Sequence, residues 1–141
     1  AGQSLVERFE NALSTADTGL AQIRAMGDAY YRFYREAPDY FSALTKASTA
    51  MAEAEEDQAL DMLCSKNELM QLMEAAIHKG LEDGTMSRER IASPAQTALY
   101  LRGALHGVIM LCQAEAGENP DFPADNLIHH TMDMLTRSIA S

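Results

Sequence analysis

Side chains able to bind metal ions or transfer protons are few in this sequence and lie far apart. Glu74 and His78 are four positions apart, so on a helix they would share one face and offer two ligands. A zinc site needs three or four ligands. The adjacent His129 and His130 would point about 100° apart on a helix and cannot reach one metal ion together. The sequence therefore predicts no metal site and no cofactor.

Motifs of the common enzyme classes are absent as well. The sequence has no Gly-rich phosphate loop, nucleophile elbow, HExxH zinc motif or Glu-x-x-His pair of the di-iron bundles. Its cysteines, Cys64 and Cys112, form no CxxC or Cys/His pattern, which is typical of reduced thiols in the core of a cytoplasmic protein. We therefore expect no catalytic residues, no enzymatic activity and a cytoplasmic location.

Charge and length exclude other classes of protein. The chain has 141 residues, 47% of them hydrophobic, and 11 Lys and Arg against 21 Asp and Glu give a net charge of −10 at pH 7. Such a chain is long and apolar enough to fold as one domain with its own core. The negative charge argues against direct binding of nucleic acid or an anionic membrane, because both need basic surface. No apolar run reaches the roughly 18 residues of a membrane helix.

The elements that must position any site are helices. Ala, Leu, Met, Glu and Gln are abundant whereas Val and Ile are few, which favours helix over strand. Apolar residues recur at helical spacing, and Pro38, Gly84 and Pro94 mark helix ends and starts. The sequence predicts an all-α fold of about six helices, over residues 4–14, 19–37, 38–51, 58–83, 94–116 and 124–140.

Methionine and aromatic residues form the most distinctive apolar set. Met26, Tyr30, Phe33 and Tyr34 share one face of the helix over 19–37, and the chain has nine Met, five Tyr and four Phe. Two interpretations are open: these side chains fill an ordinary core, or they line a ligand pocket. Met adapts to irregular surfaces, and a buried Tyr hydroxyl needs a polar partner, so both types also suit a pocket.

Several polar and small residues also allow two interpretations. Lys66 falls within an apolar arc, where it either extends its ammonium group to water or anchors an anionic effector or a buried carboxylate such as Glu74. Arg102, His106 and Gln113 form a stripe that is either a solvent edge or a polar pocket wall. Gly103 and Gly107 permit a close helix contact, either inside the chain or with a second copy.

Three segments carry sequence patterns of one known family. Residues 30–41 are similar to an aromatic-rich helix that breaks at a P-x-Y-F corner, here Pro38 to Phe41. Residues 80–86 are similar to a G-x-x-x-G-x-I/L helix ending. Residues 93–107, with Ser-Pro followed by small residues, are similar to a dimerisation helix. In this order and spacing the segments resemble the regulatory domain of the tetracycline-repressor (TetR/AcrR) family.

The resemblance implies that residues 1–141 are one effector-binding and dimerisation domain of a transcriptional regulator, a TetR-type repressor. The family's N-terminal helix-turn-helix, with its Y-x-x-F-x-x-K-x-x-L ending, is absent from this sequence. DNA is therefore expected as a partner only through such a segment outside it. A small, mostly apolar effector would change the DNA affinity of that segment. The alternatives are a stand-alone helical binding or scaffolding bundle with no DNA role and, less favoured, a small helical enzyme.

The resemblance also implies where the two kinds of site lie. The effector would sit between the helices over 19–37, 58–83 and 94–116. The implied effector-binding residues are Met26, Tyr30, Phe33, Tyr34, Lys66, Met70, Met73, Ile77, His106 and Met110. The last two helices would pair with their copies as a four-helix bundle in a homodimer. Its implied interface residues are Leu101, Gly103, Leu105, Val108, Cys112, Leu127, Thr131, Met134 and Leu135.

Overall fold

The computed structural model describes residues 5–36 and 56–141, with only the backbone described for 56–67. These ranges hold five helices and no strand, which confirms the all-α prediction. The helices are α1 (Leu5–Thr15), α2 (Gly19–Glu36), α4 (Glu56–Asp83), α5 (Pro94–Glu118) and α6 (Ala124–Ile139). Their bounds agree with the predicted ranges to within two residues at each end. The predicted helix over 38–51 lies outside the described residues.

Local signals in the sequence explain several helix ends. The Thr18 hydroxyl accepts a hydrogen bond from the backbone N–H of Ala21 at the start of α2, at 3.1 Å. Gly84, with a φ of 82°, follows α4, and its left-handed conformation ends the helix without steric cost. Ser93 caps α5 by accepting from the N–H of Gln96, and Pro94 occupies the first helical turn.

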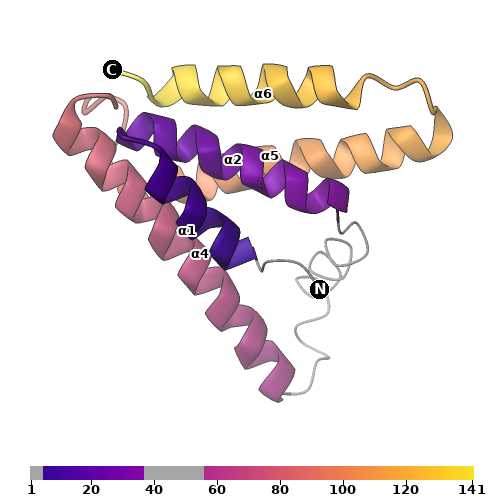
Figure 1. Ribbon diagram of the computed structural model, residues 1–141, viewed down its shortest axis with the longest axis horizontal. Coiled ribbons are helices and arrows are strands. Elements are labelled where there is room, and N and C mark those ends of the chain that lie inside the picture. Colours follow the sequence, from indigo (N-terminus) through magenta and orange to yellow (C-terminus); the bar gives the residue numbers. More distant parts are fainter. Residues whose placement is uncertain (1–4, 37–55) are drawn as a thin grey trace.

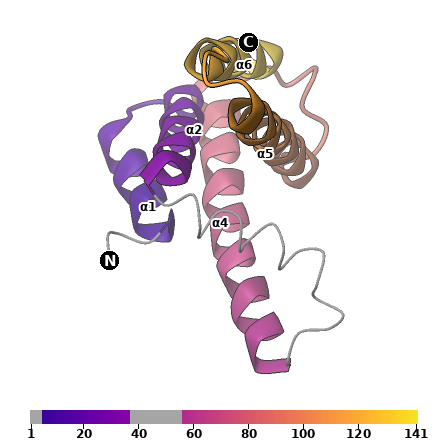
Figure 2. The same ribbon diagram turned by 90° about the vertical axis from the view of Figure 1, so that its right-hand side faces the viewer.

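The helices form a compact body, and the N-terminal part of α4 extends away from it (Figures 1 and 2). α1 packs on α2 and α4, while α2 also contacts α4 and α6. α5 and α6 form an antiparallel hairpin, and α5 also packs on α4. In the end-on view of Figure 2, α6 lies above α2 and α5, and α4 runs downward between them. No described helix is both long and apolar enough to cross a membrane.

Two buried clusters hold the helices together. The first joins α1, α2, α4 and the start of α5, and it includes Phe9, Met26 and Ile77. The second joins α5 to α6 through Leu105, Ile109, Cys112, Ile128 and Met132. Because Tyr30 of α2 and Leu135 of α6 pack against both clusters, the two clusters join into one core.

The loop after α4 fixes the C-terminal end of α6. Ser87 donates its backbone N–H to the carbonyl of Ile139 at 2.8 Å, and Ser141 donates to the carbonyl of Thr85 at 3.0 Å. The Arg90 guanidinium donates to the Ala140 carbonyl at 3.0 Å. These bonds satisfy carbonyls that the last turn of a helix leaves without partners.

The residues of the predicted dimer interface differ in their burial within the single chain. Leu101, Leu105 and Cys112 are 5%, 7% and 1% exposed inside the single chain, so they supply almost no surface to a partner. Their assignment to the interface stays a prediction, and α5 is apolar over more than half of its circumference. Met134 is 54% exposed and Gly103 is exposed. Of the other predicted interface residues, Val108, Leu127, Thr131 and Leu135 are half-buried.

Candidate functional site

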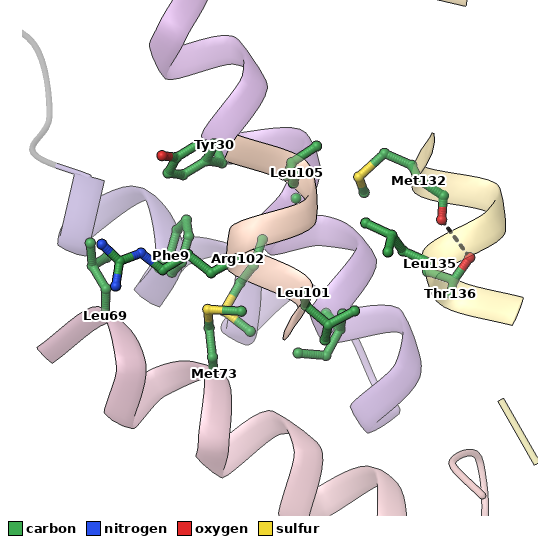
Figure 3. Close-up of a pocket in the computed structure, with 13 residues that line it drawn as sticks. Phe9, Tyr30, Leu69, Met73, Leu101, Arg102, Leu105, Met132, Leu135 and Thr136 are labelled. Atoms are coloured by element: carbon green, nitrogen blue, oxygen red, sulfur yellow. Dashed lines mark hydrogen bonds between the residues drawn. The ribbon is translucent and has the colours of Figure 1, made fainter. Parts of the chain in front are cut away.

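All five described helices contribute to one apolar cavity in the body of the protein. Each helix presents the residues of one face, three or four positions apart, as in Ile23, Met26, Gly27 and Tyr30 of α2. The other lining residues are Phe9 of α1, Leu69 and Met73 of α4, Leu101, Arg102 and Leu105 of α5, and Met132, Leu135 and Thr136 of α6. Figure 3 shows these side chains converging from the surrounding helices.

The cavity is small but its walls are adaptable. About 60 Å³ is open to water-sized groups, which is room for only a few such groups. Three of the lining residues, Met26, Met73 and Met132, have flexible and polarizable side chains. A ligand with a larger apolar body therefore needs methionine side chains or whole helices to move.

One edge of the cavity is polar. The Tyr30 hydroxyl and His106 Nδ1 lie 2.7 Å apart and share a hydrogen bond between α2 and α5. Burial raises the pKa of Tyr30 to about 12, and the nearby positive charge of Arg102 acts in the opposite direction. The phenol is therefore neutral at physiological pH. Thr136, which lines the cavity from α6, donates its hydroxyl to the carbonyl of Met132 at 2.8 Å.

The structure places the ten residues predicted to bind effector in several environments. Met26, Tyr30 and Met73 line the cavity, and His106 reaches its edge through Tyr30. Met70 packs against the first buried cluster beside them. The side chain of Lys66 lies outside the described residues.

The remaining predicted residues lie away from the cavity wall. Ile77 is fully buried in the first cluster, one turn beyond Met73. Phe33 is buried too, and the Arg8 guanidinium lies over its ring at 5.3 Å from the centroid. Tyr34 and Met110 pack against the second cluster. These four residues therefore belong to the same two clusters as the cavity wall but do not line the cavity itself.

Sequence reasoning missed most of the remaining wall. Phe9, Met132, Leu135 and Thr136 come from the first and last helices, which were not expected at the site. Leu101, Leu105 and Leu135 were assigned to the dimer interface instead. Ile23 could have been predicted from the sequence pattern, because it lies three positions before Met26 on the same helix face.

The comparison with protein families decides the classification. The model described as "Tetracyclin repressor-like, C-terminal domain" matches residues 23–135, which is well over half of the chain. The chain belongs to this family. The match begins within α2 and ends within α6, so it contains most of the cavity of this TetR-like domain.

A solved structure shows the same fold at low sequence identity. The TetR-like domain is similar to a Rhodococcus sp. RHA1 protein described as having unknown function, with a TM-score of 0.73 and 18% identity. The similarity covers 97% of this chain and 67% of the Rhodococcus chain. A search of curated proteins gave no significant match. Among the described residues of the domain, no group of three or more His, Cys, Asp and Glu could hold a metal ion.

Proposed function

We propose that this chain is the effector-binding and dimerisation domain of a TetR-like transcriptional regulator. The observation that carries the proposal is an apolar cavity walled by all five described helices in a member of this family. A small, mostly apolar effector enters the cavity and changes the DNA affinity of a helix-turn-helix segment carried by the longer protein. The chain's own charge of −10 suits a domain that does not bind DNA itself.

The mechanism follows from the small size of the cavity. An effector larger than the open space binds best to an arrangement in which the walls stand further apart, so it shifts the population toward that arrangement. Phe9 is part of the wall, and it belongs to the first helix of the chain. A segment attached before α1 is then displaced whenever the effector displaces Phe9. This coupling requires no contact between effector and DNA.

The methionine methyl groups allow a direct test of binding at the cavity. We expect 1-octanol to shift the nuclear magnetic resonance signals of isotope-labelled Met26, Met73 and Met132, because these side chains line the cavity. Met134 is the internal reference, because it is 54% exposed and lies outside the cavity wall. Shifts confined to Met134, or no shift up to the solubility limit of 1-octanol, would show that the cavity does not accept an apolar ligand.

We also propose that the domain forms a homodimer through the outer side of α5 and α6. Leu99, Leu111 and Met134 are large apolar side chains with 57%, 51% and 54% exposure. Between the two leucines, a Cβ atom added at Gly103 or Gly107 would meet nothing within 4 Å, so neither glycine serves a close contact with another described part of the chain. No other labelled helix lies on this outer side of the α5–α6 hairpin (Figure 2). A symmetric pairing would bury the whole face.

The double substitution Leu111→Glu and Met134→Glu should convert this dimer to a monomer. Charges brought into the centre of an apolar interface are expected to cost about 2 kcal/mol or more, roughly a thirtyfold rise in the dimer dissociation constant. Light scattering coupled to gel filtration measures the mass of each variant. Ala75→Glu, at an exposed position of α4, is the matched control and should remain dimeric. A wild-type chain that is monomeric at micromolar concentration contradicts the proposal.

A further inference from the structure

The wall of the apolar cavity contains a cationic side chain. Arg102 is half-buried on α5 between Leu101 and Leu105, and the other described lining residues are uncharged. Figure 3 shows its side chain extending along the cavity toward the side where Leu69 lies. The Tyr30 hydroxyl points to the same side of the view. The cavity therefore has one positively charged edge and an otherwise uncharged, mostly apolar wall.

No carboxylate neutralises this charge within the described part of the chain. The ion pairs there are Arg8–Glu36, Arg24–Asp133 and Arg35–Asp125, and Arg102 takes part in none of them. Other arginines find neutral acceptors, as Arg88 and Arg90 do at backbone carbonyls. This arrangement is notable in a chain with 21 acidic residues against 11 basic ones. A guanidinium at an apolar cavity is costly unless an anion compensates it.

The neighbouring polar groups do not supply that anion. Burial raises the pKa of Tyr30 to about 12 against the opposing charge of Arg102, so its phenol is neutral and does not serve as an anion. Its hydroxyl is engaged with His106 Nδ1 at 2.7 Å. On the α6 side, the Thr136 hydroxyl donates to carbonyls of its own helix. Among the described residues, the charge of Arg102 is therefore available to a ligand.

Resting on the proposed function, we propose that the effector is an apolar carboxylic acid whose carboxylate binds Arg102. The planar guanidinium presents paired N–H donors that match the two oxygens of a carboxylate. A carboxylate also adds little volume in a cavity of about 60 Å³. The apolar body of the acid then lies among Met26, Met73 and Leu105, where flexible methionines can make room.

Paired probes of equal chain length test this inference. Octanoate and 1-octanol share their apolar body and differ in the charged head group, so calorimetric titration of the whole chain measures the contribution of the charge. We expect octanoate to bind wild type at least about tenfold more tightly than 1-octanol. Arg102→Met should remove that preference and leave the affinity for 1-octanol within about twofold, because its apolar wall is retained. Arg102→Lys keeps the charge but not the paired donors. Its preference for octanoate over 1-octanol should therefore lie between those of wild type and Arg102→Met.

The controls separate failure of this inference from failure of the proposed function. Arg32→Met removes one charge from an exposed position of α2 and should change neither affinity. Thermal unfolding of each variant verifies that it is folded. If both probes bind wild type equally, or Arg102→Met leaves octanoate affinity unchanged, the carboxylate inference is wrong while effector binding stands. If neither probe binds, the proposed function is wrong, and the inference fails with it.

Discussion

Replacement of Gly19 by alanine is expected to destabilise the fold by about 3 kcal/mol, because α2 and α4 touch through their backbones at this point. A Cβ atom at Gly19 would lie 2.0 Å from the backbone nitrogen of Gly80 and 2.5 Å from the carbonyl oxygen of Ala76. Neither atom can rotate away as the end of a side chain can. The two helices must therefore separate. Urea unfolding followed by far-ultraviolet circular dichroism measures the loss.

Two other glycines provide matched controls for this substitution. A Cβ at Gly27 would meet the Cε and Sδ atoms of Met132 at 2.3 and 2.6 Å, and this flexible side chain can move, so the expected cost is about 1 kcal/mol. A Cβ at Gly117 would meet nothing within 4 Å, so alanine there should be neutral or slightly stabilising. If Gly19→Ala is no more destabilising than Gly27→Ala, the backbone contact between α2 and α4 is not tight.

The same crossing also sets the geometry of the cavity. The Asp83 carboxylate at the end of α4 accepts hydrogen bonds from the Gly19 N–H at 2.9 Å and from the Thr85 hydroxyl at 2.6 Å. The Thr85 and Gly19 donors hold the pKa of Asp83 below its usual range. These hydrogen bonds join the start of α2 to the end of α4. On the cavity wall, Ile23 lies about one turn from Gly19 and Met73 nearly three turns from Asp83. In the proposed mechanism, α4 is expected to pivot about these hydrogen bonds.

The helix bounds could be predicted from the sequence because their signals are local. Thr18, Gly84 and the Ser93-Pro94 pair act through their own backbone or the adjacent turn. The contact between Gly19 and Gly80 could not be predicted, because it depends on which helices cross and where. The side of α5 that faces outward could not be predicted either. Apolar residues cover more than half of the circumference of this helix, so their periodicity gives no preferred direction.

The candidate site was predicted only where residue type and helix face agreed. Met26, Tyr30 and Met73 were found because their apolar side chains recur on single faces of α2 and α4. Phe9 and Met132 were missed because the positions of α1 and α6 relative to those faces are set by tertiary packing. Periodicity alone also fails to separate a cavity wall from a closed core.

Met73 and Ile77 show most clearly that periodicity does not separate a cavity wall from a closed core. They are one turn apart on the same face of α4, and both were predicted to bind effector. Ile77 is fully buried and does not line the cavity, whereas Met73 lines it. Ile77→Ala should lower the free energy of unfolding by about 3 to 4 kcal/mol through the void it leaves. It should leave the octanoate affinity of the folded protein within about twofold, because the cavity wall is unchanged. Urea unfolding and calorimetric titration measure the two effects.

Met73→Ala should show the opposite balance. Because Met73 already borders open space, its truncation removes fewer packing contacts and should cost less stability than Ile77→Ala. The enlarged cavity should favour a longer acid, so the ratio of decanoate to octanoate affinity should rise by about tenfold, as two more methylene groups become buried. Titration of both variants under conditions where both are folded gives the comparison. If Ile77→Ala changes the chain-length preference as much as Met73→Ala does, the cavity extends one turn further along α4, and the sequence prediction that included Ile77 holds after all.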